Sequence, residues 1–260
     1  MSEFSTWWAY AHFAFAVKQR ERYFRSPEMD EFLRLVLETS ANRQATIPAG
    51  RIFFRAQLGN GWRTVGAGDE EFDDVAPHEP ERMRPRPNAA TEGRVNPKGI
   101  PCLYLATDAN TAMAEVRPWL GMFVSVAQFK TVRDLRIINC SAEHSQDYTF
   151  YPEEPPPPER ERAVWRDIDR SFSEPVHADE ISANYVPTQI LAEYFKRNGF
   201  DGVVYKSLLG DGYSVALFDL AAADQINCQL HTARRLSFTF EEVTNPYFIR
   251  KHYPELEPKE

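Results

Sequence analysis

The sequence is poor in the features that mark secreted and membrane-spanning proteins. It has only three cysteines, Cys102, Cys140 and Cys228, which are widely spaced and form no C-x-x-C pair. An odd number of isolated cysteines predicts neither a disulfide framework nor a cysteine zinc site. The most apolar N-terminal stretch, residues 7–17, is too short for a transmembrane helix, which needs about 20 residues. These absences predict a reduced, cytoplasmic protein without a membrane partner.

A surplus of positive charge is also missing. The 260 residues include 38 acidic and 30 basic side chains, which gives a net charge of −8 at pH 7. Nucleic acid is therefore not an expected partner, because a polyanion would be repelled on average. With 43% hydrophobic residues the chain can bury a large core. One main domain with appendages is expected, since single cores stop growing at roughly 250–300 residues.

Several motifs that bind phosphate, zinc or an acyl group are absent. The sequence contains no G-x-x-x-x-G-K-[ST], no H-E-x-x-H and no G-x-S-x-G. The six histidines are scattered outside the predicted strands, which favours surface or loop positions over metal ligation. We therefore expect no bound metal and no resident cofactor.

Two helices are expected in an N-terminal extension over residues 1–45. Residues 5–25 carry aromatic side chains near helical spacing, followed by basic residues. Ser26 and Pro27 resemble an N-cap and a first helical residue, and this second helix should run to about Thr39. Docking on the main domain is the favoured interpretation. Binding to a partner or to a membrane surface is the alternative, although surface-active helices carry denser Lys and Arg.

The main domain is predicted over residues 46–225. It begins with a strand at residues 51–56, which contains Arg55 in an apolar setting. Residues 59–101 are rich in Gly, Pro and acidic residues, so we expect a long loop with an insertion near residues 60–92. Such long loops in compact domains are commonly functional, which makes this one a weak pointer to a site.

The middle of the chain reads as strands around a short helix. A strand is expected at residues 102–106 and a helix at residues 107–115. Residues 121–129 and 135–140 predict two further strands in a meander. A second insertion, near residues 141–175, is acidic and proline-rich, and we expect it to be extended and exposed.

The last part of the domain predicts a helix followed by a hairpin. Residues 187–198 have an apolar face, and Gly199 stands at the C′ position. Residues 202–207 and 213–218 read as two strands of a hairpin. Residues 226–260 would pack on the domain or form a tail. The predicted fold class is α+β, with a mixed, mainly antiparallel sheet and short flanking helices.

Several of these segments together resemble the RES family, which is named for its Arg, Glu and Ser. The most specific pieces are RVNPKGIPCLYLA at residues 94–106, TAMAE at residues 111–115 and DGVVYKS at residues 201–207. The resemblance covers about residues 50–220. The sequence departs from the family pattern at Val95, where an aromatic residue is usual, and in its long loops.

The resemblance implies a fold similar to ADP-ribosyltransferases and an activity on NAD as substrate. The expected enzyme is an NAD glycohydrolase or NAD phosphorylase, which cleaves the nicotinamide–ribose bond and passes ADP-ribose to water or inorganic phosphate. The alternatives are an ADP-ribosyltransferase that modifies a protein, or a catalytically silent nucleotide-binding or interaction module. Several family members are toxins neutralised by a helix-turn-helix antitoxin. Whether this chain is a toxin, which antitoxin it meets and whether it forms a homo-oligomer stay open.

The resemblance also assigns site residues. Catalytic roles fall to Glu115, Arg55 and Ser207, and NAD-binding roles to Arg55, Arg94, Asn96, Tyr104 and Ser207. Neutral nicotinamide leaves without protonation, so a single carboxylate such as Glu115 suffices to stabilise an oxocarbenium-like ribose. Without the motif, Glu115 would read as an exposed helix glutamate.

The other residues have chemistry that suits a dinucleotide. Arg55 and Arg94 can bind pyrophosphate oxygens through paired hydrogen bonds, whereas the alternatives are a salt bridge for Arg55 and a solvated loop position for Arg94. Tyr104 can stack on the cationic nicotinamide ring or simply pack in the core. We expect Ser207 to bind and orient rather than attack, because no base accompanies it; otherwise it is a turn serine.

Overall fold

The computed structural model describes residues 3–87, 89–142, 144, 150–174, 182–237 and 239–240. The helices are α1 (Ala9–Gln19), α2 (Pro27–Thr39), α3 (Pro80–Met83), α4 (Ala109–Glu115), α5 (Pro157–Ser173) and α6 (Val186–Arg197). The strands are β1 (Gln44–Ile47), β2 (Ile52–Leu58), β3 (Gly61–Val65), β4 (Phe72–Ala76), β5 (Leu103–Ala106), β6 (Phe123–Thr131), β7 (Leu135–Asn139), β8 (Gly202–Lys206), β9 (Tyr213–Leu217) and β10 (Ala223–Thr232). Short 3-10 turns lie at Ser40–Arg43, Gly68–Glu70 and Ser182–Tyr185.

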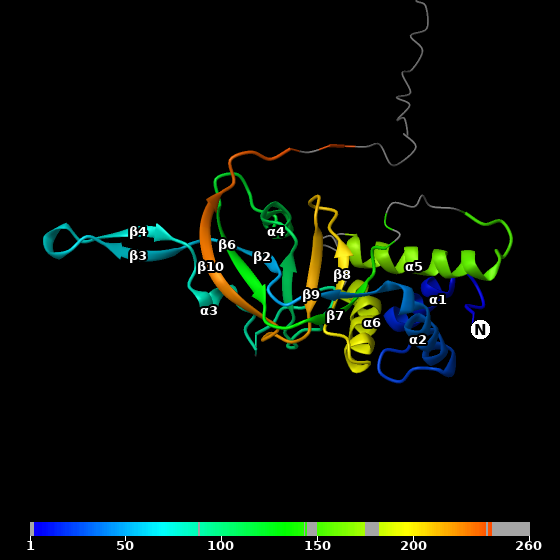
Figure 1. Cartoon of the computed structure of the whole chain (residues 1–260). Coiled ribbons are helices and arrows are strands. Elements are labelled where there is room, and N and C mark those ends of the chain that lie inside the picture. The colour runs from blue at the N-terminus through cyan, green and yellow to red at the C-terminus, as the bar shows by residue number, and fades with distance from the viewer. Residues whose placement is uncertain are drawn as a thin grey trace, which may run out of the picture.

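An eight-stranded sheet forms the centre of the molecule, in the order β1-β7-β8-β9-β5-β2-β6-β10 (Figure 1). Only β7 and β8 pair in parallel, and the other neighbours are antiparallel. β2 and β5 are joined by a single residue pair, Phe54 opposite Ala106. The α+β class with a mixed, mainly antiparallel sheet is confirmed, as is the β8–β9 hairpin.

Four helices, α1, α2, α5 and α6, gather at the end of the sheet formed by β1, β7 and β8 (Figure 1). Their apolar faces share one core cluster with the sheet, and Trp165, Phe172 and Phe195 are completely buried in it. Phe13 of α1 stacks on Phe32 of α2 with ring centroids 4.6 Å apart. The N-terminal helices are thus docked on the main domain. In the part of the chain that the structure describes, no helix is long and apolar enough to cross a membrane.

The prediction of an extended, exposed excursion at residues 141–175 is wrong for its second half. α5 occupies residues 157–173 and buries Val164, Trp165, Ile168 and Phe172. The prolines before it do not prevent a helix, because they stand at its start, where the missing amide would have no intrahelical partner. The segment is part of the core rather than an insertion upon it.

The long loop expected over residues 59–101 contains regular structure. β3 and β4 form a separate antiparallel hairpin that projects away from the body of the molecule (Figure 1). Gly66, at φ +95, occupies its turn. Short α3 follows and buries Met83 completely.

The expected meander of the strands at 121–129 and 135–140 is also wrong. β6 lies between β2 and β10, whereas β7 lies between β1 and β8 at the other end of the sheet. Nine-residue β6 finds long partners on both sides, so its pairing is set by distant segments rather than by its neighbour in sequence. The boundary placed at residue 225 falls inside β10, which also carries His231, a histidine expected outside the strands.

Candidate active site

Helix α4 is pinned to the β8–β9 loop by a small polar cluster. Asp108 caps the helix by accepting hydrogen bonds from Thr111 N and Thr111 Oγ1, both at 2.8 Å. Thr111 Oγ1 in turn accepts from Gly212 N at 2.9 Å. A side chain at Gly212 would overlap Asp108 Oδ2, and one at Gly210 would come within 2.8 Å of Thr111 Cα. The glycines therefore permit the close approach that places the end of α4 over the hairpin.

Glu115, the last residue of α4, meets two serines of that hairpin. Glu115 Oε1 accepts a hydrogen bond from Ser207 Oγ at 2.6 Å and a longer one from Ser214 Oγ at 3.3 Å. Ser207 Oγ itself accepts from the amides of Leu209 and Gly210, both at 3.2 Å. Both serines are buried, whereas Glu115 is exposed. One carboxylate oxygen is thus held in place while the group stays accessible to a ligand.

Tyr104 and Tyr205 are phenols whose pKa values respond to the charges around the site. Burial raises the pKa of both phenols well above the usual value, and the charge of nearby Arg94 counteracts that rise in each case. The charge of Glu115 adds to the rise of the pKa of Tyr205. Arg94 and Glu115 therefore both lie close enough to Tyr205 to influence the pKa of its phenol.

Arg94 is not a solvated loop residue. It is half-buried, and its Nη1 and Nη2 donate to the carbonyl oxygens of Ser171 at 3.2 Å and Ser173 at 3.3 Å. These carbonyls belong to the last turn of α5, where they lack helical partners. Arg94 therefore anchors the end of α5 as well as supplying positive charge beside the two tyrosines.

Asn96 and Tyr104 form a closed hydrogen-bond network. Asn96 Nδ2 donates to the carbonyl oxygens of Thr91, Pro97 and Ile100 at 2.8–3.2 Å. Tyr104 Oη donates to Asn96 Oδ1 at 2.6 Å and accepts from the amide of residue 95 at 3.0 Å. Asn96 is 4% exposed. Its polar atoms are used within the loop, so the geometry supports a loop-ordering role, and direct NAD contact stays a prediction.

Arg55 has no carboxylate partner among the described residues. Its Nε donates to Met83 O at 2.8 Å and its Nη1 to Tyr104 O at 3.0 Å. Burial, with a smaller contribution from the like charge of Arg82, lowers the pKa of Arg55 to about 10, which leaves the guanidinium charged at neutral pH. A half-buried cation whose protein partners are neutral carbonyls is suited to an anion. The salt-bridge alternative for Arg55 is therefore not what the structure has.

Arg55 opens into a cavity of about 350 Å³ at the junction of β2 and β5. Tyr104 and Asn96 line it, together with three further arginines, Arg82 from α3 and Arg84 and Arg86 from the segment after it. No acidic residue is among the described residues that line it. A ligand in this cavity would meet a concentration of positive charge in a protein whose net charge is −8.

The structure brings the predicted residues together in two groups. Glu115 and Ser207 are in direct contact, and Arg55, Asn96 and Tyr104 line the cavity. Sequence reasoning missed Ser214, which faces Tyr205 across the hairpin register, and the arginines of RMRPRP at residues 82–87. The hairpin pairing could have indicated Ser214. The alternating arginines in an acidic chain could have indicated the cavity, but the prolines among them favoured the prediction of a loop.

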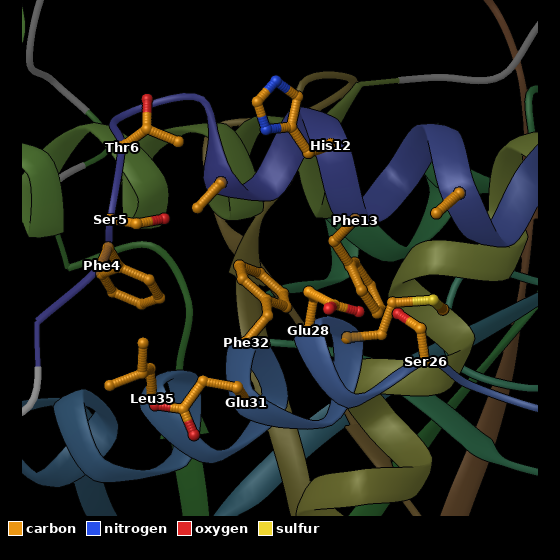
Figure 2. Close-up of a pocket in the computed structure, with 13 residues that line it drawn as sticks. Phe4, Ser5, Thr6, His12, Phe13, Ser26, Glu28, Glu31, Phe32 and Leu35 are labelled. Atoms are coloured by element: carbon orange, nitrogen blue, oxygen red, sulfur yellow. The ribbon is translucent and has the colours of Figure 1, made fainter.

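A second cavity, of about 440 Å³, lies between the N-terminal segment, α1 and α2. Figure 2 shows Phe4, Phe13, Phe32 and Leu35 around this space, with Ser26, Glu28 and Glu31 beside them. None of the predicted site residues lines it. The candidate active site therefore consists of the Glu115 cluster and the arginine-lined cavity, which hold the predicted residues.

Comparison with known proteins agrees with the motifs at this site. The family described as RES domain matches residues 62–241, which include Arg94, Glu115 and Ser207 but begin after Arg55. No curated protein matches the chain. A chain in the crystal structure of the M. tuberculosis MbcT–MbcA toxin–antitoxin complex is similar at 14% identity and a TM-score of 0.41, over 76% of this chain and 92% of that one. Because the family match spans well over half of the sequence, the chain belongs to the RES domain family.

Proposed function

We propose that this protein cleaves the nicotinamide–ribose bond of NAD and passes ADP-ribose to water or inorganic phosphate. The observation that carries the proposal is the accessible Glu115 carboxylate, held by Ser207 at 2.6 Å near the buried Tyr205. A cavity lined by arginines supports it. This combines one fixed negative charge with a site for an anionic dinucleotide. Membership of the RES domain family supports the same activity.

The chemistry needs little beyond that carboxylate. The C1″–N bond breaks, and its electron pair stays on the pyridinium nitrogen, so nicotinamide leaves as a neutral molecule. The ribose becomes oxocarbenium-like, and Glu115 stabilises its positive charge or binds its hydroxyls. Water then attacks C1″ and releases a proton, which gives ADP-ribose. Attack by inorganic phosphate gives ADP-ribose 1″-phosphate.

The surrounding residues take binding roles in this proposal. Ser207 donates to Glu115 Oε1 and keeps the carboxylate oriented. Arg55 has donors beyond the two used on carbonyls, and Arg94 supplies charge beside the tyrosines, so both suit the pyrophosphate. The ring of Tyr104 lines the cavity and can stack on a cationic ring. NAD is the substrate, and the scheme needs no resident cofactor.

Toxicity and an antitoxin partner belong to the same proposal. Loss of NAD would inhibit growth, and the similar solved structure is described as a toxin–antitoxin complex. A helix-turn-helix antitoxin would then be the neutralising partner. Induced expression should arrest growth only while Glu115 is intact, and growth arrest by the Glu115→Gln protein would count against NAD loss as the cause.

Product analysis tests the activity directly. The purified full-length protein is incubated with NAD, with and without inorganic phosphate, and the products are separated. Free ADP-ribose indicates water as acceptor, and the 1″-phosphate indicates phosphate. Labelled protein indicates ADP-ribosyl transfer. Intact NAD without released nicotinamide would overturn the proposal and favour a silent nucleotide-binding module.

A further inference from the structure

α3 and the segment after it carry three arginines, Arg82, Arg84 and Arg86, that the proposed cleavage of NAD does not use. Met83 is fully buried and accepts from Arg55 Nε, so the segment is anchored beside the site. Pro85 and Pro87 then restrict the backbone that presents Arg84 and Arg86. The arginines therefore reach the cavity from a fixed piece of chain rather than from a free loop.

These three arginines differ in how their charge is compensated. Arg84 donates to Leu220 O at 3.1 Å and pairs with Asp224 at 3.1 Å, so it is engaged by the protein. The guanidinium of Arg82 donates to the neutral Gln57 Oε1, at 2.9 Å, and has no ion-pair partner among the described residues. The side chain of Arg86 has no hydrogen-bond or ion-pair partner among the described residues, and both Arg82 and Arg86 are exposed. Two guanidinium groups at the cavity are thus left without an anion.

The cavity does not include the residues assigned to bond cleavage. Its lining includes Arg55, Tyr104, Arg82 and Arg86, but neither Glu115 nor Ser207. A substrate whose nicotinamide ribose lies at Glu115 and whose pyrophosphate lies at Arg55 would extend its adenosine half into this cavity. A volume of about 350 Å³ suits part of such a ligand.

We propose that Arg82 and Arg86 form a subsite for a third phosphate group, the 2′-phosphate on the adenosine ribose of NADP. This inference rests on the proposed function and names its substrate class. The pyrophosphate is matched by Arg55 and Arg94, whereas a phosphate monoester is a dianion that needs donors of its own. Guanidinium groups are the side chains that accommodate a ribose 2′-phosphate in dinucleotide sites. The bond broken is the same for both dinucleotides.

Binding of two nucleotides that lack the scissile bond tests the subsite apart from catalysis. Calorimetry on the full chain compares adenosine 2′,5′-bisphosphate with 5′-AMP. We expect the bisphosphate to bind at least about tenfold more tightly, which corresponds to the lower range for hydrogen bonds to charged groups. The Arg82→Gln/Arg86→Gln double variant should lose that preference. Arg63→Gln, an exposed arginine on the projecting β3–β4 hairpin, should keep it.

Three outcomes discriminate between the possibilities. Equal affinity for the two nucleotides, or a preference that survives the double variant, would overturn the inference. If adding inorganic phosphate abolishes the preference and phosphate alone binds through Arg82 and Arg86 as tightly as the bisphosphate, the subsite takes free phosphate, and the inference of a ribose phosphate is wrong. A preference that depends on both arginines, with neither NAD nor NADP cleaved, would support the phosphate subsite and overturn the proposed function.

Thermal unfolding of each variant provides the folding control. The replaced side chains are exposed, so the midpoints should stay near that of the parent protein. The ratio of kcat/KM for NADP to that for NAD gives a second measurement. It should exceed one in the parent protein and fall about tenfold in the double variant.

Discussion

The two ends of the site differ in how their charges are satisfied. The carboxylate end, formed by Glu115, Ser207 and Ser214, is complete before a substrate arrives, because the serines already donate to Oε1. The arginine end, formed by Arg55, Arg82, Arg84 and Arg86, keeps positive charge facing a cavity without acidic lining. The first arrangement preorganises a charge for the transition state, whereas the second awaits an anion. Chemistry and affinity should therefore respond to different substitutions.

The largest effect should follow from Glu115→Gln, which removes the charge and keeps the shape. We expect kcat to fall by about 100- to 1,000-fold, or about 2.7–4 kcal/mol, because a preorganised electrostatic group is lost. NAD affinity, measured by calorimetry, should change little. A variant that folds and turns over NAD at the parent rate would show that Glu115 is not the catalytic carboxylate.

Arg55→Ala should act on binding rather than on the chemical step. Loss of hydrogen bonds to a charged phosphate costs about 1.5–3 kcal/mol, so KM for NAD should rise at least about tenfold while kcat falls less. Arg63→Ala, at an exposed arginine outside the cavity, serves as the control for loss of one positive charge. The reverse pattern, with KM unchanged and kcat strongly reduced, would move Arg55 from the arginine end into the chemistry.

The effects of replacing Ser207 and Ser214 on kcat should follow the lengths of their hydrogen bonds to Glu115. Ser207→Ala should raise the activation free energy by about 1 kcal/mol and so lower kcat, since it removes the 2.6 Å hydrogen bond. The effect stays small because water can replace the hydroxyl at an exposed carboxylate. Ser214→Ala removes the 3.3 Å bond, and we expect only a few tenths of a kcal/mol. Steady-state rates with thermal unfolding as a control measure both. A larger effect at Ser214 would contradict this order.

Local patterns predicted the elements whose structure is set locally. Helix α6 ends at Arg197, two residues before Gly199, which has a positive φ that stops a helix. Pro27 begins α2, because proline needs no hydrogen-bond partner for an amide at the first helical position. The β8–β9 hairpin follows in the same way from its short glycine-containing loop.

Elements that depend on distant partners were predicted less well. Pro155 to Pro158 suggested an extended segment, but the apolar face around Trp165 finds a core built by α2 and β8. Contacts such as Trp165 Nε1 to Thr39 Oγ1, at 2.9 Å, join residues 126 positions apart. A local sequence pattern does not identify a partner so far away in the chain. For the same reason, it did not predict that β6 and β7 lie in opposite parts of the sheet.

The site was predicted in its residues rather than in its geometry. The motifs named Glu115 and Ser207, but their contact depends on how closely Gly210 and Gly212 let the hairpin approach α4. The arginine end was half missed, because Arg82 and Arg86 come near Arg55 only after α3 folds against β2. Side chains that meet only through such packing are not marked by a sequence motif of fixed spacing.

The single residue pair between β2 and β5 makes the sheet two ladders that meet at a seam. Arg55 on β2 donates to the backbone oxygen of Tyr104 on β5. Its guanidinium thus supplies a hydrogen bond between two strands that share few backbone hydrogen bonds. An anion bound to the same guanidinium would restrict its motion and so stabilise the hydrogen bond to Tyr104. Occupation of the site should then slow amide hydrogen exchange along β2 and β5 more than in β7, far from the seam. Bound substrate would thus stabilise the junction between the two parts of the sheet.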